Sequence, residues 1–281
     1  YSRDLLVNSD NELWIGTESG VYIYNLRTDK YVHLYSSKDD PYSLSDNAVY
    51  SLCEDREGGI WVGSYFGGVD YYPKSYTYFE KYYPKDGDNN LHGKRVREFC
   101  EDNKGILWIG TEDGGLNRFN LKTKDFSFFA PSAGFTNIHG LCLVDDKLWV
   151  GTFSKGLKVI DTRSGVVLKT YQKNDSPRSL IDNSIFAICK TATGDIYLGT
   201  MFGLVRYNKQ SDDFDRIPEL NGKFIYDIKE DSAGNIWLAT YANGVYCYNV
   251  NDRKWKNYVH DDKDNTSLPY NKVSSVFEDS H

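Results

Sequence analysis

A short turn recurs in this sequence directly after each W-[IV]-G-T-type run, and its residue types suit the binding of a sugar. The two residues of the turn vary, whereas the residues around them repeat. Variable positions on a repeating frame can carry binding specificity. An aromatic ring stacks on the face of a sugar ring, and Arg, Asn or His hydrogen-bonds the hydroxyl groups at its edge. The candidate ligand-binding residues are Tyr65, Phe66, Arg97, Glu112, Asp113, His139, Phe153, Asn183 and Tyr241.

These candidates also have structural interpretations. The rings of Tyr65 and Phe153 could fold back on the strands that carry them, and this alternative stays as open as ligand contact. Asn183 stands at the end of a long loop, two residues before an apolar run. Asn commonly caps such turns with its own side chain. For Asn183 the turn role is favoured over ligand contact.

Signals for catalysis are weak. The sequence contains no G-x-S-x-G, P-loop or H-E-x-x-H motif. The chain has 40 acidic residues, and those in its E-D-x-x-G runs are predicted to form turns on the opposite face from the candidate site. The run at 86–90 has the D-x-D-x-N spacing of a calcium loop, but Leu91 and Arg97 replace its glycine and bidentate glutamate. We therefore expect no catalytic residues, no metal and no cofactor.

Composition narrows the class of partner. Aromatic residues make up 15% of the 281 residues, which favours strands. The net charge is −7 and no long basic cluster occurs, so nucleic acid and anionic membranes are not expected as partners. No apolar run is long enough to span a bilayer. The chain starts at Tyr1 without a Met or a signal peptide, which suggests a mature segment or a piece of a longer protein.

The chain is a repeat with a period in the forties. Its anchor aromatics lie 47, 47, 41, 48 and 40 residues apart, at Trp14, Trp61, Trp108, Trp149, Tyr197 and Trp237. This period is typical of propeller blades or helical pairs. Each repeat holds four short alternating runs separated by turn residues, with no long helical periodicity. The sequence therefore predicts an all-β fold, a β-propeller of four-stranded blades with six full repeats in a single domain or fragment over 1–281.

The two ends leave the blade count open. The run at 273–281 matches the first strand at 49–55 and stops before its Trp. It could complete the first blade and close a six-bladed ring, or it could begin a further blade of a truncated seven-bladed ring. The second alternative is slightly favoured.

Residues that recur at one repeat position are expected to build the blades. The Trp should pack against the neighbouring blade, and the glycine two residues later should leave room for its close approach. A second glycine, as in Gly156 or Gly244, should take a positive φ at the turn. Four of the five cysteines share one position in the first strands of different repeats. We expect them to be free buried thiols without a disulfide.

The repeats resemble the two-component regulator propeller family. The residues that carry the resemblance are [GE]-x-W-[IV]-G-T-x-x-G-[GVL] with a downstream S-L-x-x-N-x-[VI]; the match weakens at Tyr197 and at Ala239. Such repeats are similar to those in periplasmic sensors of hybrid histidine kinases from Bacteroides-like bacteria, where two seven-bladed propellers precede an immunoglobulin-like domain, a membrane helix and a kinase. Those sensors respond to breakdown products of polysaccharides.

The resemblance implies a non-catalytic, periplasmic sensor segment that binds an oligosaccharide or mediates a homodimer of the parent sensor. This segment itself would contact neither membrane nor nucleic acid. One alternative is a protein-docking scaffold in secretion or surface assembly. A less favoured one is a propeller lyase or glycosidase, because His139 alone does not make a catalytic cluster.

Overall fold

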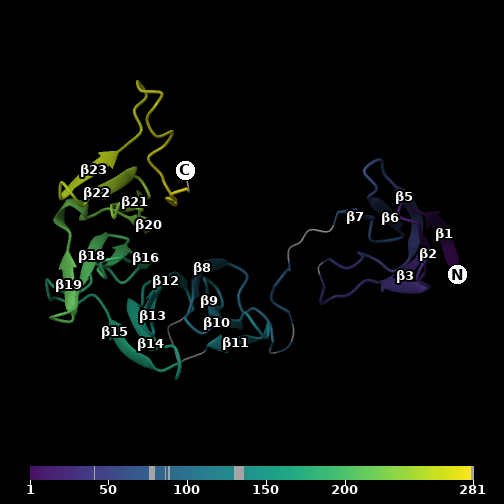
Figure 1. Cartoon of the computed structure of the whole chain (residues 1–281), viewed down its shortest axis with the longest axis horizontal. Helices are drawn as coiled ribbons and strands as arrows, with labels where there is room; N and C mark the ends of the chain where they lie inside the picture. Colours follow the sequence, from purple (N-terminus) through teal and green to yellow (C-terminus); the bar gives the residue numbers. More distant parts are fainter. Residues whose placement is uncertain (41, 76–79, 86, 88, 130–135, 280–281) are drawn as a thin grey trace. The chain divides into compact units, whose positions relative to one another are not determined.

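The computed structural model describes residues 1–40, 42–75, 80–85, 87, 89–129 and 136–279 (Figure 1). The chain divides into two compact units, Tyr1–Lys81 and Tyr82–His281, which we call unit 1 and unit 2. Each is described by itself below. That the whole chain forms one domain stays a prediction.

Unit 1 contains two antiparallel sheets. The first has the order β1 (Ser2–Val7), β2 (Glu12–Thr17), β3 (Gly20–Asn25), β4 (Lys30–Leu34). The second has three strands, β5 (Val49–Glu54), β6 (Ile60–Ser64) and β7 (Val69–Tyr72). The four-stranded repeat predicts a fourth strand for this sheet, over the Tyr- and Phe-rich run at 78–83. Residues 78 and 79 lie outside the described residues, and 80–83 form no strand, so this prediction is wrong for the described part.

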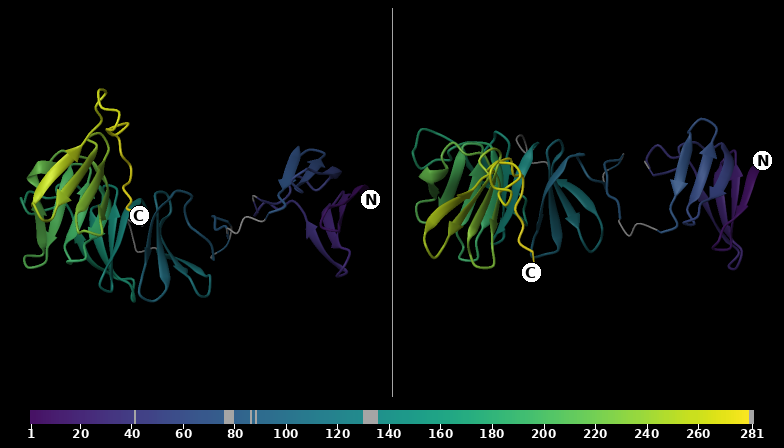
Figure 2. Two further views of the ribbon diagram at one scale, coloured as in Figure 1. Left: turned by 45° about the horizontal axis from the view of Figure 1, so that its top comes forward. Right: turned by 90° about the horizontal axis from the view of Figure 1, so that it is seen from above.

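Unit 2 contains four sheets of four antiparallel strands, each in chain order along the sheet. Figure 2 shows them following one another along the chain. Their strands are β8 (Val96–Glu101), β9 (Ile106–Thr111), β10 (Gly115–Asn120), β11 (Phe126–Phe129); β12 (Ile138–Val144), β13 (Lys147–Thr152), β14 (Leu157–Asp161), β15 (Val167–Tyr171); β16 (Ile185–Lys190), β17 (Ile196–Thr200), β18 (Gly203–Asn208), β19 (Asp213–Arg216); β20 (Ile225–Glu230), β21 (Ile236–Thr240), β22 (Val245–Asn249) and β23 (Lys254–Tyr258). The four-stranded repeat unit and the all-β propeller architecture are thus confirmed. Only a 3₁₀ turn at Pro218–Leu220 is helical among the described residues.

The core lies between consecutive sheets, where the first strands β8, β12, β16 and β20 contact their neighbours. Trp108 is fully buried in a cluster with Ile138 and Leu141 of the next sheet. A Cβ at Gly110 would lie 2.6 Å from Ile138, so only glycine lets the sheets approach this closely. The turn glycine also behaves as expected: Gly156 has φ +77°. The blade-building roles of these residues are confirmed.

Two expectations about burial need correction. Trp61 is 42% exposed, and within unit 1 the described residues form no sheet after β5–β7 that could cover it. The five cysteines are free, as expected, but the recurring position is not fully buried: Cys53 is exposed, Cys100, Cys142 and Cys189 are half-buried, and only Cys247, at another position, is buried. In unit 2, burial raises the pKa of Cys142 and of Cys189 to about 11.

The Asp of the E-D-x-x-G run holds the turn between the first two strands of a sheet. In unit 2, Asp102 Oδ1 accepts hydrogen bonds from the backbone N–H groups of Lys104 and Ile106, at 2.9 and 3.1 Å. Its Oδ2 accepts one from Trp108 Nε1 at 3.1 Å. Asp55 and Asp231 hold Trp61 and Trp237 in the same way. These carboxylates are therefore structural, as the sequence predicted.

Segment 273–279 is not assigned as a strand, although the sequence predicted one. It nevertheless makes the contacts of a first strand. Asp227 Oδ2 accepts from Val276 N at 3.2 Å, as Asp4 accepts from Leu52 N in unit 1. No second strand lies beside this segment among the described residues, and a ladder needs a partner. Since β1 already fills the first-strand position of the first sheet, the segment is not required to complete that sheet.

Candidate functional site

Every first strand of the six sheets is interrupted at one equivalent position by a break in register. Such a β-bulge leaves one residue unpaired and re-aims its side chain, and bulges are common beside functional sites. We call the six skipped residues the bulge residues. They are Arg3, Tyr50, Arg97, His139, Phe186 and Tyr226.

Most bulge residues contact the variable turn residue of their own sheet. Arg97 Nη1 lies 3.2 Å from Glu112 Oε1. The rings of His139 and Phe153 are 5.8 Å apart, and those of Tyr226 and Tyr241 are 6.1 Å apart. The bulge therefore brings together two positions of each repeat that the sequence separates by about 15 residues. The structure places the predicted residues Arg97, Glu112, His139, Phe153 and Tyr241 in this arrangement.

In unit 2 the bulge residues of successive sheets also contact one another. His139 Nε2 lies 3.8 Å from Glu112 Oε1 of the preceding sheet, and its ring meets the Phe186 ring of the next sheet edge to face at 4.6 Å. The Arg97 guanidinium lies 5.7 Å from the Phe186 ring and 5.5 Å from the Tyr226 ring. Four sheets thus contribute side chains to one cluster, which we call the bulge site.

An aromatic group extends the bulge site along the last sheet. The rings of Phe224 and Tyr226 stack at 4.8 Å, and Phe224 stacks with Tyr241 at 5.5 Å. Lys272 Nζ lies 4.8 Å above the Tyr241 ring. Phe186 and Tyr226 were not predicted as site residues. The sequence could have indicated them, because both residues occupy the second position of a first strand, where the residue type varies from repeat to repeat.

Burial decides the charge state of the bulge site. Desolvation, helped by the Arg97 charge, lowers the pKa of His139 to about 4, and the Glu112 carboxylate opposes this only in part. His139 is 6% exposed, and its Nδ1 has no hydrogen-bond partner; Arg97 Nε is likewise buried without one. Next to the bulge, burial raises the pKa of Glu98 to about 7. At neutral pH the His139 imidazole is therefore neutral, and it lies beside the contact between Arg97 and Glu112.

Unit 1 has an equivalent but more open group. Arg3 Nε donates to Glu18 Oε1 at 2.8 Å, and its guanidinium lies 4.2 Å above the Tyr50 ring. Tyr50 stacks with Tyr65 at 5.1 Å, and Tyr65 meets Phe66 edge to face at 4.3 Å. Phe66 is 85% exposed, so it does not fold back fully on its sheet.

Two further predicted residues are engaged by the backbone. Asp113 Oδ1 accepts from the N–H groups of Lys94 and Arg95, at 3.0 and 3.1 Å, and these bonds lower the pKa of the carboxyl. Asn183 Oδ1 accepts from Lys173 N at 2.7 Å, which closes the long loop before β16. These contacts agree with the turn role that the sequence favoured for Asn183.

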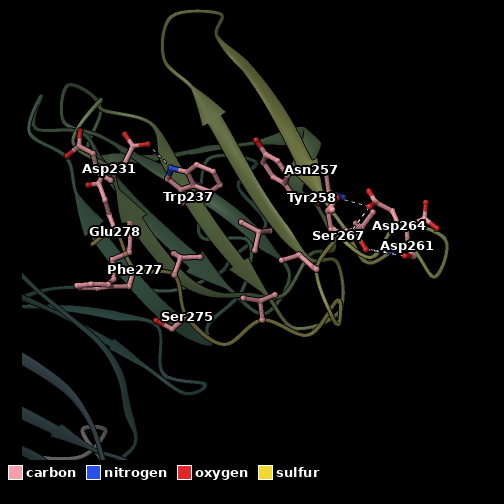
Figure 3. Close-up of a pocket in the computed structure, with 18 residues that line it drawn as sticks. Asp231, Trp237, Asn257, Tyr258, Asp261, Asp264, Ser267, Ser275, Phe277 and Glu278 are labelled. Atoms are coloured by element: carbon pink, nitrogen blue, oxygen red, sulfur yellow. Dashed lines mark hydrogen bonds between the residues drawn. The ribbon is translucent and has the colours of Figure 1, made fainter. Parts of the chain in front are cut away.

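The large cavity of unit 2 lies elsewhere. It has a volume of about 1160 Å³ and lies between β20–β23 and the C-terminal segment (Figure 3). Trp237, Tyr258 and Phe277 line it, and none of the nine predicted site residues does. Among the described residues, no group of three or more His, Cys, Asp or Glu side chains could hold a metal ion. Positions 86 and 88 of the D-x-D-x-N run lie outside the described residues.

Comparison with known proteins finds one repeat family that matches three stretches of the chain. The two component regulator propeller model matches residues 43–66, 90–113 and 219–242. Each match contains a bulge residue and the turn residue of the same sheet, as with Arg97 and Glu112. No curated protein matches the chain. No helix in the described part of the chain is long and apolar enough to cross a membrane.

Solved structures with the same fold include extracellular domains of two component systems. The extracellular domain of the hybrid two component system BT3049 from B. thetaiotaomicron is 25% identical, with a TM-score of 0.52 over 92% of this chain and 34% of that chain. That of BT4673 from B. thetaiotaomicron is 18% identical, with a TM-score of 0.50 over 91% and 42%. PorZ, a surface component of the type-IX secretion system of Porphyromonas gingivalis, is 15% identical, with a TM-score of 0.53 over 98% and 43%. The latter two show the fold alone, and this chain spans well under half the length of all three.

Proposed function

We propose that this chain, which is built from two component regulator propeller repeats, is a non-catalytic sensor segment that binds an oligosaccharide at the bulge site of unit 2. The repeats and the likeness to extracellular domains of two component systems support a sensor role. The oligosaccharide is our inference from the side chains that the bulge site presents.

The bulge site carries the proposal. Its Phe and Tyr rings offer flat apolar faces, and Phe153 and Tyr241 are 40% and 44% exposed. Sugars present an apolar C–H face and a rim of hydroxyl groups, so they match a site that places aromatic faces beside Arg97, Glu112 and His139. The scaffold repeats from sheet to sheet while these positions vary, which lets one fold recognise different sugars.

The parent protein in this proposal is a hybrid histidine kinase of the inner membrane, and the segment lies in the periplasm. The sheets are close-packed through glycine contacts such as Gly110 against Ile138, so a blade resists internal deformation. Binding would therefore act by moving whole domains or by holding two sensors together. Contacts within a homodimer of the parent sensor belong to this proposal as well.

Thermal-shift screening against a panel of glycans, followed by calorimetry, tests the proposal. We expect at least one glycan to raise the melting temperature of the wild-type chain. Phe153→Ala and Tyr241→Ala should each weaken binding of that glycan by about tenfold or more, because a stacked aromatic contact contributes roughly 1.5 kcal/mol or more with its buried area.

Phe128→Ala is the matched control. Phe128 is 41% exposed, almost the same as Phe153, but lies on the outer strand β11 and stacks on His92. It should leave glycan affinity unchanged. If no glycan shifts the melting temperature and a protein partner binds tightly instead, the sensor proposal fails in favour of a docking scaffold. Equal losses in Phe128→Ala and Phe153→Ala would place the site elsewhere.

A further inference from the structure

We propose that the large cavity of unit 2 is a docking site for a β-hairpin of the same repeat type, supplied by the parent protein. The first strand of this hairpin pairs with segment 273–279, and its apolar side chains fill the cavity, which Trp237 and Phe277 border (Figure 3). The inference concerns the assembly of the parent protein, so it stands or fails independently of glycan binding at the bulge site.

In the other sheets of unit 2, the next sheet packs against the anchor aromatic at fixed positions. Two apolar residues of the second strand of the next sheet lie in one cluster with the anchor, and a residue of its third strand joins them. The contacts to Trp108 come from Leu148, Val150 and Ile160, those to Trp149 from Ile196, Leu198 and Tyr207, and those to Tyr197 from Ile236, Leu238 and Tyr248. Two strands of a following sheet therefore supply this cover each time.

Trp237 lacks this cover within the described part of unit 2. It is half-buried, and the cavity of about 1160 Å³ lies beside it. Leu268 and Val273 of the C-terminal segment are also half-buried, whereas the equivalent residues Leu180 and Ile185 are 0% exposed. The cavity is large enough to hold several apolar side chains. It therefore lies where a second and a third strand of a following sheet would place theirs.

The C-terminal segment is already positioned as the first strand that such a hairpin needs. Thr240 O accepts a hydrogen bond from Val273 N at 2.9 Å. The Glu278 carboxylate accepts from Ser232 N and from Ser232 Oγ, both at 2.8 Å. Among the described residues no strand pairs with this segment, so its backbone N–H and C=O groups offer an edge for a strand to join.

The hairpin must come from outside the 281 residues. In all six described sheets the second strand is already paired with its own first strand, so neither this chain nor a second copy offers a free repeat hairpin there. The chain covers 34% of the BT3049 extracellular domain, so a parent of comparable length has room for one. A small apolar molecule could fill the cavity but would leave the strand edge unpaired, whereas a hairpin satisfies both features.

An extended form of the full chain tests the docking site. The sequence at 278–281 matches that at 230–233 in three of four positions, so a copy of residues 234–249 added after His281 continues the repeat. We expect the amide hydrogens of 273–279 to exchange at least roughly a hundredfold more slowly in the extended chain, because they become part of a ladder. The melting temperature of unit 2 should rise by roughly 4 °C or more.

The matched control is the same extension with Ser at the copied positions of Ile236 and Leu238. It retains the backbone hydrogen bonds of the strand but removes the two side chains that should enter the cavity. Most of the rise in melting temperature should therefore be lost.

Cross-linking tests the register of the pairing. Lys229 lies opposite Trp237 in the last sheet, and Phe277 occupies the position equivalent to Lys229. In a Cys53→Ser background, Phe277→Cys should form a disulfide with a Cys at the copied Trp237 position. Val276→Cys should not, because neighbouring residues of a strand point to opposite faces.

Four results would overturn the proposal. Unchanged exchange and melting in the extended chain would refute the docking site, and an equal rise with the Ser control would show that the cavity does not select apolar side chains. Equal cross-linking from Val276→Cys would refute the register. A dimer of the unextended chain in sedimentation, with 273–279 protected from exchange, would make a second copy the occupant. Glycan binding is measured separately on the unextended chain, so each of these failures leaves the proposed function intact.

Discussion

Replacement of Asp102 by Asn tests how the repeat holds its buried tryptophan. Asp102 is 6% exposed and accepts two backbone N–H groups through Oδ1 and the Trp108 indole N–H through Oδ2. In Asp102→Asn, the amide oxygen can still serve the backbone. The amide NH₂ group then faces the indole N–H, so two donors oppose each other. Trp108 is 0% exposed, so water cannot reach the indole nitrogen.

The expected loss follows from one buried donor left without an acceptor, which costs about 2 kcal/mol. Unit 2 holds the 200 residues Tyr82–His281. For a cooperative unit of this size, about 2 kcal/mol corresponds to a fall of roughly 4–8 °C in melting temperature. Asp231→Asn is the comparison variant, because Asp231 makes the same bonds to the backbone and to Trp237, with one further bond from the part-buried Asn235 side chain. Trp237 is only half-buried, so water can replace the lost bond and the fall should stay below about 2 °C.

Differential scanning calorimetry at neutral pH measures both variants, which lose the same charge. A double-mutant cycle with Trp108→Phe should recover a coupling of about 1–3 kcal/mol between Asp102 and Trp108. Equal falls for Asp102→Asn and Asp231→Asn would show that charge rather than the buried indole governs the effect. No fall for Asp102→Asn would refute the argument that this bond stabilises the blade.

Three further predictions concern protonation, close packing and thiol reactivity. The pKa of His139 is about 4 in the folded chain and near 6.5 in the unfolded chain, so between these pH values only the unfolded state binds the proton and stability is lost as pH falls. At pH 5 the loss in the free energy of unfolding is about 2 kcal/mol. Urea unfolding at several pH values should show this part of the pH dependence in the wild type and not in His139→Phe. Gly110→Ala should destabilise unit 2 by about 1–3 kcal/mol, because its Cβ would lie 2.6 Å from a side-chain carbon of the next sheet. Gly140→Ala, whose Cβ would lie 3.2 Å from its nearest neighbour, should destabilise it less. Similar losses in the free energy of unfolding for the two variants would contradict the packing argument. An aromatic disulfide reagent should modify exposed Cys53 first and Cys142 far more slowly, since burial raises the pKa of the Cys142 thiol to about 11; equal rates would refute this order.

The roles of the repeated residues could be predicted from the sequence, because each role depends on neighbouring residues in the chain. The alternating runs predict strands, the turn glycines predict positive φ, and the Trp spacing predicts the blade period. The buried Trp108 and the crowded Gly110 follow from these rules. The exposure of Trp61 does not follow from these rules, because burial of the face of the sheet that carries Trp61 depends on whether a further sheet covers it.

The sequence by itself therefore determined the strands, the four-stranded repeat and the variable turn that holds Glu112 and Phe153. The tertiary structure alone decided that Arg97 and His139 are bulge residues and that His139 lies between Glu112 and Phe186. A bulge is a break in register between two paired strands, so neither strand contains it alone. Contacts between sheets depend on how the blades pack, and the spacing within one repeat does not specify them.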